Sequence, residues 1–269
     1  MFNFLINCFS KKRIVILHNH LFKNAGSTID AALKLKFKDN FVDDRNDFEM
    51  INNKSYLLKI LSDKKIKALS SHHIPIHPIL PSNVTIIEII MFRHPLNRVA
   101  SVYNFERKHD VSLFSSHPGV QMANKLNIED YVKWRLKTTS GGTIRNFHMN
   151  KIFGNSYKEK GKNEIIKRLE SITLLGIVEN FNQSMVLFEE TLSSFGIKIN
   201  LKHLPVNMSE NNEHSKFFLK KKLSSRTYEN LIQKNKEDLL CYKIAEDIFL
   251  KRLKTIKNFQ KKLQNYAER

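Results

Sequence analysis

The stretch VILHNHLFKNAGSTIDAALKL, residues 15–35, joins an apolar run to a polar loop and then to a helix-forming segment. We predict a buried strand over Arg13–His18 and a helix over Ser27–Lys36, with a loop between them that suits a phosphate at the helix N-terminus. In the common nucleoside-triphosphate loop the lysine follows the second glycine. Here Lys23 stands three residues before Gly26. The stretch therefore predicts a phosphate site whose lysine approaches from the strand side.

A second apolar run, NVTIIEIIMF at Asn83–Phe92, is continuous enough for a central strand of a parallel sheet. It leads at once into a predicted helix that begins at Pro95. The segment SITLLGIVENFNQSMVLFEETL repeats the strand-then-helix pattern, with Asn180 as the expected cap. From Ser224 onward the chain is basic and predicted to be helical. Strands that alternate with helices predict an α/β fold with a central, mostly parallel sheet flanked by helices.

We expect one domain over residues 1–269, with a core of about 13–250, because no repeat and no Pro/Gly-rich linker divides the chain. Residues 37–69 are polar and mixed, and only a short helix near Ser55–Leu61 is predicted there. The overlapping segment IKALSSHHIPIHPILP is interpreted as a short apolar run that ends in a loop rich in histidine and proline.

The composition limits the class of protein. Lys and Arg number 45 against 26 Asp and Glu, which leaves a formal net charge of +19. This surplus is compatible with nucleic acid, a membrane surface, an anionic nucleotide or a polyanionic acceptor, and equally with a solvated lysine surface. A hydrophobic share of 41% excludes a disordered chain. Two cysteines are too few for a disulfide framework.

The N-terminal segment MFNFLINCFSKKR is apolar but shorter than the roughly 20 residues that span a bilayer. A secretory signal would carry its positive charge first. We interpret the segment as a loose lead into the first strand, with a short interfacial anchor, and so a weak membrane-surface contact, as the alternative. Lacking an anchor and a disulfide framework, the chain is expected in a bacterial cytoplasm rather than the Golgi lumen.

The strand ending at Phe92 is followed by Arg93, where nucleoside triphosphatases usually have an aspartate that helps to hold Mg²⁺. Ser101 lies eight residues further on, on the expected polar side of the next helix. Both can bind one phosphate, although an arginine at this place can also pair with a surface carboxylate. Residues expected on the same polar side are Asn97, Arg98 and Asn104. Two phosphate sites without a metal-binding aspartate indicate a nucleotide phosphorylated at both ends of its ribose.

Two segments, HNHLFKNAGST and FRHPLNRVASVYNF, resemble the donor-binding motifs of the sulfotransferase family, and are most similar to the branch that sulfates glycan hydroxyls, as in heparan sulfate. Weaker similarities follow in LSSHHIP, LLGIVENFNQSMVLF, VNMSENN and LIQKNKEDLLCYKIAEDIF, so that the resemblance spans roughly residues 13–250. It implies a fold like that of the P-loop nucleotide kinases. It also implies transfer of a sulfuryl group from 3′-phosphoadenosine-5′-phosphosulfate to a carbohydrate hydroxyl, with no metal required.

Individual roles follow from the resemblance by position. Lys23 would stabilise the bridging oxygen of the leaving phosphate, and Arg93 with Ser101 would hold the 3′-phosphate. His73 falls in the register of the family's histidine base when Pro75 is aligned. His72 replaces the usual glycine and is the alternative base. The loop residues that would hold the 5′-phosphosulfate are Lys23, Asn24, Ala25, Gly26, Ser27 and Thr28.

The segment GGTIRNF departs from the family pattern Asn-x-Gln-x-Arg. Gly141 and Thr143 stand where the asparagine and glutamine would be, while Arg145 keeps its register. The acceptor is therefore expected only as a carbohydrate or other hydroxyl compound, anionic if the basic surplus recruits it. The sequence does not indicate an oligomeric state.

The remaining histidines are expected to form hydrogen bonds with the backbone; they include His18, His20 and His148. No metal site is expected, because His72, His73 and His77 have no cysteine or carboxylate at zinc spacing. Two rival functions remain open: a P-loop-type small-molecule kinase that depends on Mg²⁺, and a basic nucleic-acid-binding protein. The ordered motifs favour the sulfotransferase, and nucleic acid is not expected as a partner.

Overall fold

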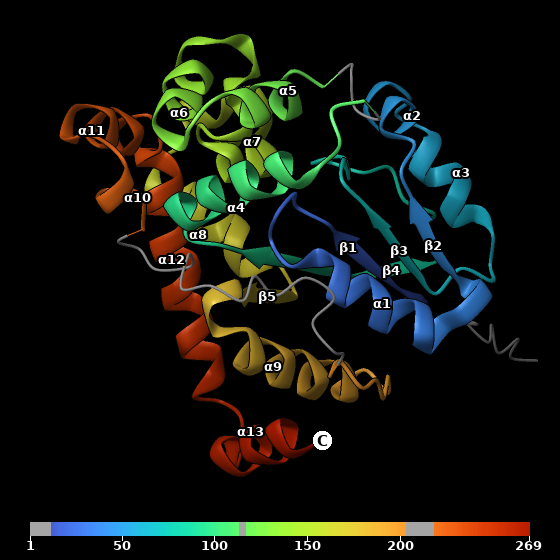
Figure 1. The fold of residues 1–269 in the computed structure, drawn as a ribbon. Coiled ribbons are helices and arrows are strands. Elements are labelled where there is room, and N and C mark those ends of the chain that lie inside the picture. The colour runs from blue at the N-terminus through green and yellow to red at the C-terminus, as the bar shows by residue number, and fades with distance from the viewer. Residues whose placement is uncertain (1–11, 113–116, 203–217) are drawn as a thin grey trace, which may run out of the picture.

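The computed structural model describes residues 12–112, 117–202 and 218–269. Within these ranges, five parallel strands form one sheet in the order β2-β3-β1-β4-β5 (Figure 1). The strands are β1 (Arg13–Asn19), β2 (Phe41–Asp44), β3 (Ala68–Ser71), β4 (Val84–Phe92) and β5 (Leu174–Ile177). The predicted α/β class with a central parallel sheet is confirmed.

The middle strand, β1, pairs with β3 on one side and with β4 on the other. Its last residue, Asn19, lies opposite Ser71 of β3 and Ile90 of β4. Because the strands are parallel, the loops that follow β1, β3 and β4 all leave the sheet at the carboxyl ends of the strands, which we call the loop edge of the sheet. The chain places β2 and β3 on one side of β1 before it places β4 on the other. This edge is therefore the topological switch point, where open α/β sheets bind ligands.

The α-helices are α1 (Gly26–Phe37), α2 (Asp47–Asn52), α3 (Tyr56–Ser62), α4 (Pro95–Lys108), α5 (Pro118–Lys125), α6 (Ile128–Lys137), α7 (Phe147–Phe153), α8 (Lys162–Ser171), α9 (Phe181–Ser194), α10 (Phe218–Lys222), α11 (Ser225–Gln233), α12 (Lys236–Leu253) and α13 (Phe259–Glu268). Short 3₁₀ turns are η1 (Lys38–Asn40), η2 (Thr139–Thr143), η3 (Gly154–Glu159) and η4 (Val178–Asn180).

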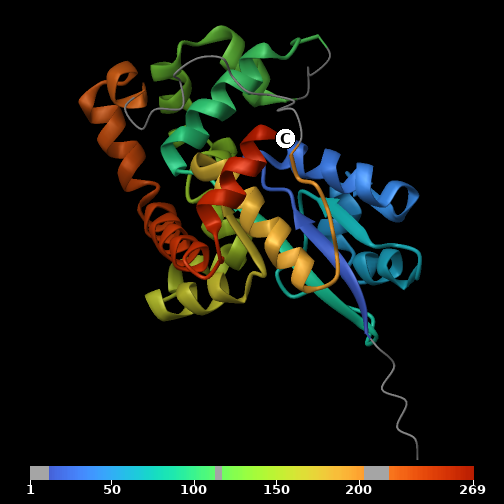
Figure 2. The same ribbon diagram turned by 90° about the horizontal axis from the view of Figure 1, so that it is seen from below.

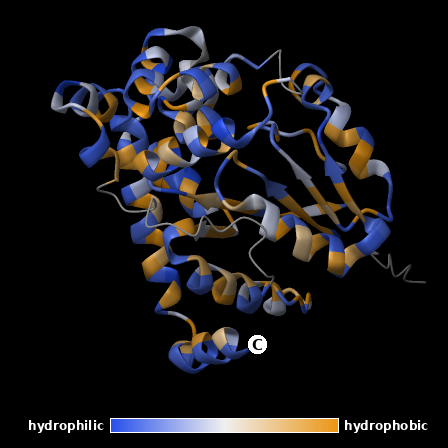
Figure 3. Cartoon of the chain, in the orientation of Figure 1, coloured by the Kyte–Doolittle hydropathy of each residue, from blue (hydrophilic) through white to orange (hydrophobic). Residues whose placement is uncertain are grey.

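Helix α12 packs against β5, α7 and α8, and lies far from β2 in both views (Figures 1 and 2). From its end the chain turns back, so that α13 packs on α9. The helices carry both hydrophilic and hydrophobic residues (Figure 3), as expected for elements that cover a sheet with one side. The predicted helical C-terminal region is confirmed.

Successive residues of β1 enter different core clusters. Ile16 belongs to the cluster that contains Leu33 of α1, whereas Leu17 belongs to the cluster that contains Leu61 of α3. Since neighbouring side chains of a strand point to opposite faces, α1 and α3 cover opposite faces of the sheet. Burial of each such side chain stabilises the fold by about 1.5–3 kcal/mol. The end of β1 is thus held from both sides.

Two strands, β2 and β3, were not predicted. The short apolar run interpreted at residues 66–69 leads into β3, and the loop rich in histidine and proline begins directly after it, at His72. Ser70 and Ser71 are fully buried in β3, and the Ser70 hydroxyl lies 3.2 Å from Nδ1 of His18. β2 is the outermost strand beside β3 and has the half-polar sequence FVDD. Both strands have only four residues, and neither has the long apolar run that identifies β1 and β4.

Asn180 precedes α9 as predicted, but its side chain caps no backbone group. It donates instead to Oε1 of Gln183 at 2.9 Å. In the described part of the chain, every helix is too short or too polar to cross a bilayer. The N-terminal segment, with its alternative of an interfacial anchor, lies outside the described residues, and so does the segment VNMSENN.

Gly26, the first residue of α1, is required by close packing. A Cβ atom at this position would lie 2.2 Å from the ring of His20. That ring cannot move away freely, because its Nδ1 lies 2.6 Å from the carboxylate of Asp30 in the next turn of α1. A side chain at position 26 would therefore separate β1 from α1.

We predict that Gly26→Ala lowers the free energy of unfolding by about 1–3 kcal/mol, the usual range for overpacking, as measured by urea denaturation. Gly142→Ala is the matched control, because a Cβ there meets nothing within 4 Å. The control should show no loss. Equal stability of the two variants would contradict the close contact between Gly26 and His20.

Candidate functional site

The loop between β1 and α1 has an unusual backbone. Lys23 and Ala25 adopt φ angles of 63° and 61°, in the left-handed region that residues with a Cβ rarely occupy. Asn24 lies between them and is 1% exposed. Its Nδ2 donates to the carbonyl of Met91 in β4 at 2.7 Å and lies 2.9 Å from Nε2 of His148. The loop is therefore anchored to the sheet edge through Asn24.

Asn24 was expected to contact the phosphosulfate ligand. In the structure its Nδ2 is bonded to the protein, and its backbone N–H donates to the carbonyl of Leu21 at 3.1 Å. Ala25 is the left-handed cap residue of α1, and no side chain caps the first turn. The first amide groups of a helix have no intrahelical partner. Gly26, Ser27 and Thr28 therefore offer backbone N–H groups, and Ser27 is exposed.

On the other side of the loop, Asp30 of α1 holds the end of β1. Its two carboxylate oxygens each lie 2.6 Å from a histidine Nδ1, one of His18 and one of His20. Arg45 donates to the same carboxylate at 2.7 Å. Burial would raise the pKa of Asp30, but the contacts with His18 and His20 outweigh it and hold the pKa well below its usual range. The carboxylate of Asp30 is therefore ionised and holds the end of β1 to α1.

The ligand atoms of His18, His20 and Asp30 all lie within 4.8 Å of one another, which is close enough for one metal ion. However, the guanidinium of Arg45 lies 3.0 Å from Nδ1 of His20. It already places a positive charge where the cation would be bound. The arrangement suits a hydrogen-bonded support of the loop better than a metal site.

Lys23 lies among other cations. Its ammonium lies 4.3 Å from the ring centroid of Phe105, on α4. Burial, and then the charges of Arg93 and Lys108, lower the pKa of Lys23 to about 8. Arg93 donates to the carbonyl of Lys23 at 3.1 Å. In the described part of the chain Lys23 forms no ion pair with a carboxylate.

Arg93 is buried directly after β4. Burial lowers its pKa, and the carboxylate of Glu179 opposes this effect. Glu179 also has other partners: Oε1 accepts from the backbone N–H of His94 and from Nδ2 of Asn97, each at 2.9 Å, and Oε2 accepts from Tyr242 at 3.1 Å. The structure therefore brings Arg93 and Lys23 together at the predicted site, with Glu179 of η4 bonded to the start of α4 beside them.

Ser101 lies one helical turn before Phe105 on α4 and so shares the side that faces Lys23. The expectation that Asn97 and Arg98 share a polar surface with it was wrong, since both are buried. Arg98 donates to the carbonyl of Phe22 at 3.3 Å and to that of Thr143. Arg98 therefore supports the loop between β1 and α1 from inside the protein instead of facing solvent.

The two candidate bases follow β3 at the same sheet edge. Nδ1 of His72 lies 2.7 Å from the carbonyl of His20. A carbonyl only accepts, so we assign the proton of neutral His72 to Nδ1 and the lone pair to Nε2. Nδ1 of His73 lies 3.0 Å from the ammonium of Lys151, which also donates to the carbonyl of His72 at 3.0 Å. Nε2 of His73 lies 3.6 Å from Asp47.

Burial lowers the pKa of both His72 and His73, so both favour the neutral form. Burial also lowers the pKa of Lys151 to about 8. Lys151 comes from α7, far away in the sequence, and no motif indicates it. Within the described residues no hydrogen bond engages Nε2 of His72, and its ring lies 4.6 Å from that of His20, between ring centroids, at the start of the first loop. This lone pair is therefore available to accept a proton.

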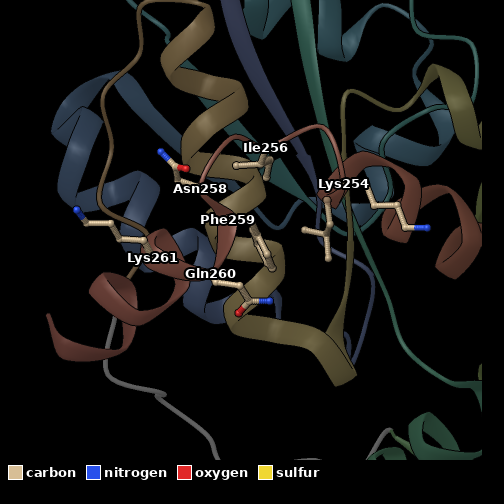
Figure 4. A pocket seen from close by; sticks show the side chains of 7 residues that line it. Lys254, Ile256, Asn258, Phe259, Gln260 and Lys261 are labelled. Carbon is tan, nitrogen blue, oxygen red and sulfur yellow. The ribbon is translucent and has the colours of Figure 1, made fainter.

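Other predicted positions lie away from this arrangement. Arg145 donates to the carbonyls of Leu136 and Thr138, at 3.2 and 2.9 Å, and thereby closes the end of α6. An open hollow of about 670 Å³ lies at the turn between α12 and α13, where Ile256, Phe259 and Lys261 are among its lining residues (Figure 4). None of these lining residues belongs to the predicted motifs.

Comparison with known proteins finds a relative but no function. An uncharacterized protein of Archaeoglobus fulgidus is 28% identical over 252 residues, which cover 88% of this chain and 98% of that protein. No family model matches the sequence. No solved structure matches it either.

We predict that the ammonium of Lys23 titrates near pH 8, well below the ordinary value of about 10.4. Competitive acetylation as a function of pH, followed by mass spectrometry of the Lys23 peptide, measures this. Lys108→Gln removes one neighbouring positive charge, which disfavours the charged form, and should raise the pKa of Lys23. An ordinary pKa for Lys23 in the unaltered protein would contradict the burial of its ammonium among cations.

Proposed function

We propose that the protein is a sulfotransferase that uses 3′-phosphoadenosine-5′-phosphosulfate. The observation that carries the proposal is the pair of Lys23 and Arg93 at the switch point of the sheet, where Arg93 donates to the carbonyl of Lys23 at 3.1 Å and the charges of Arg93 and Lys108 lower the pKa of Lys23. Like charges held close together in a partly buried place destabilise the protein unless an anion joins them. A nucleotide with phosphates at both ends of its ribose would supply that charge. The strand order is compatible with the fold like that of the nucleotide kinases, which the resemblance implies.

A Mg²⁺-dependent kinase is supported less well. Its metal is held by an aspartate at the end of a strand near the phosphate loop. The two strands that flank β1 offer no such group, because β3 ends in Ser71 and β4 is followed by Arg93. A direct contact between cations and phosphates fits these residues better than a contact through a metal ion.

In the proposed reaction, the 5′-phosphosulfate lies against the first turn of α1 and the 3′-phosphate against Arg93 and Ser101. An acceptor hydroxyl attacks the sulfur, and the bond from sulfur to the bridging oxygen of the 5′-phosphate breaks. A histidine takes the hydroxyl proton. Lys23 and the N–H groups of the loop stabilise the negative charge that develops on the departing phosphate. The products are the sulfated acceptor and 3′-phosphoadenosine-5′-phosphate.

The resemblance favours His73 as the base, but the hydrogen bonds favour His72. Nδ1 of His73 receives the hydrogen bond of Lys151, so its lone pair is already engaged and its proton lies on Nε2, toward Asp47. His72 has its proton held by the carbonyl of His20 and its Nε2 lone pair available. We therefore assign the base to His72 and regard His73 as the partner of Lys151.

For the acceptor we propose a carbohydrate hydroxyl, since the motifs are most similar to those of glycan sulfotransferases. Such a hydroxyl is a weak acid and benefits from a neutral imidazole as base. An anionic glycan would use the basic surplus of the chain, and its KM would then rise with salt. Nucleic-acid binding without turnover remains the alternative explanation of the charge, and is distinguished by strongly salt-dependent affinity for DNA or RNA. We propose a cytoplasmic setting.

We predict that 3′-phosphoadenosine-5′-phosphate binds at least about tenfold more tightly than adenosine 5′-phosphate, because a charge-assisted contact contributes about 1.5–3 kcal/mol. Isothermal titration calorimetry in the presence of EDTA measures both affinities. Arg93→Gln should reduce the preference. Equal affinities in the unaltered protein, or binding that needs Mg²⁺, would remove the support for a 3′-phosphate site.

We predict that His72→Asn lowers kcat for sulfuryl transfer by roughly 10²–10⁴, the range for a lost general base, with donor affinity nearly unchanged. Asparagine keeps a donor for the carbonyl of His20 but cannot accept the proton. His73→Asn is the matched control and should have the smaller effect. If His73→Asn is the more damaging, the register of the resemblance is right and our assignment of the base is wrong.

A further inference from the structure

The first loop is connected to helix α12 by three buried side chains. Asn24 contacts His148 on α7, and Nδ1 of His148 lies 3.3 Å from Asp238 on α12. Each of the three is at most 1% exposed. None of them is assigned a step in the proposed reaction. We propose that His148, oriented by Asp238, is a positioning residue that holds Asn24 and thereby keeps the phosphate loop in its left-handed form.

The direction of each hydrogen bond follows from the contact of Asn24 with β4. Its Nδ2 lies 2.7 Å from the carbonyl of Met91. Since that carbonyl only accepts, the amide cannot be turned round without placing two acceptors together. The second hydrogen of Nδ2 therefore points to Nε2 of His148, at 2.9 Å. Nε2 must accept this bond, so neutral His148 carries its proton on Nδ1.

Asp238 is suited to fix this tautomer. Its carboxylate accepts from the backbone N–H groups of His148 and Met149, at 3.0 and 2.9 Å, and so is anchored to the start of α7. Burial would raise the pKa of Asp238, but the contact with His148 and the two N–H bonds lower it. The ionised carboxylate attracts the Nδ1 proton across 3.3 Å through its charge, since the contact does not have the geometry of a hydrogen bond. A histidine that is held in one tautomer by a carboxylate is a recurrent way to orient an imidazole.

The loop depends on this orientation because its backbone is strained. Left-handed residues with a Cβ persist only where the surroundings hold them, and Asn24 is the residue between Lys23 and Ala25. If the tautomer of His148 reverses, an N–H group of His148 faces an N–H group of Asn24. The loop then loses an anchor, and the carbonyl of Lys23 moves relative to Arg93, its donor at 3.1 Å.

The test is Asp238→Asn, which keeps the shape of the side chain but allows its amide to donate to Nδ1 and so to favour the wrong tautomer. Hydrogen exchange of the ligand-free protein, followed by mass spectrometry, should show faster exchange in residues 20–27 and unchanged exchange in β5. The affinity for 3′-phosphoadenosine-5′-phosphate should fall by about tenfold or more, as misplaced binding groups do. Asp247→Asn is the matched control on the same helix, where the side chain is half-exposed and pairs with Lys243.

The affinity measurement depends on the proposed function, but the exchange measurement does not. If the unaltered protein fails to bind the nucleotide, the proposed function fails and the exchange result still decides the role of His148. If Asp238→Asn does not fold, Asn24→Ala and His148→Phe test the same connection, and each should loosen residues 20–27 while the double variant loosens them no further. Unchanged exchange in the loop of folded variants, or additive effects of Asn24→Ala and His148→Phe, would overturn the proposal.

Discussion

The left-handed backbone at Lys23 and Ala25 is the constraint on which the candidate site depends. It costs about 1–2 kcal/mol for each residue, so it exists only because the surroundings hold it. On one side Asp30 holds the end of β1 through His18 and His20. On the other side Asn24 is held by β4 and α7. The loop can therefore turn the N–H groups at the start of α1 toward the edge of the sheet.

The positive charges at the carboxyl ends of the strands are the feature of the loop that the proposed function would use. Burial and the positive charges of Arg93 and Lys108 oppose the ammonium of Lys23, as its lowered pKa shows. A bound anion would reverse the effect, because it favours the charged form of the lysine. Under the proposed function, the loss of stability in the free protein would become affinity for an anion. Ordinary surface lysines, which make up much of the +19 charge, have no such property.

The two adjacent histidines show how local hydrogen bonds separate similar residues. His72 and His73 differ by one position in the sequence, but one bonds to a carbonyl and the other to an ammonium. The carbonyl leaves Nε2 of His72 able to accept a proton, whereas the ammonium engages the lone pair of His73. Their chemistry is therefore set by what each Nδ1 contacts and not by alignment.

The sequence by itself determined the α/β class, the strands β1 and β4, the helices that follow them and the positions of Lys23 and Arg93. Those features depend on local patterns: apolar runs, a helix start and a loop of known layout. Only the tertiary structure decided that β3 pairs with β1, that Asn24 turns inward and that Lys151, His148 and Asp238 support the site. These residues come from α7 and α12, and the distance along the chain leaves no local pattern. Their roles arise from burial and hydrogen-bond direction, which exist only once the sheet has brought its edge loops together.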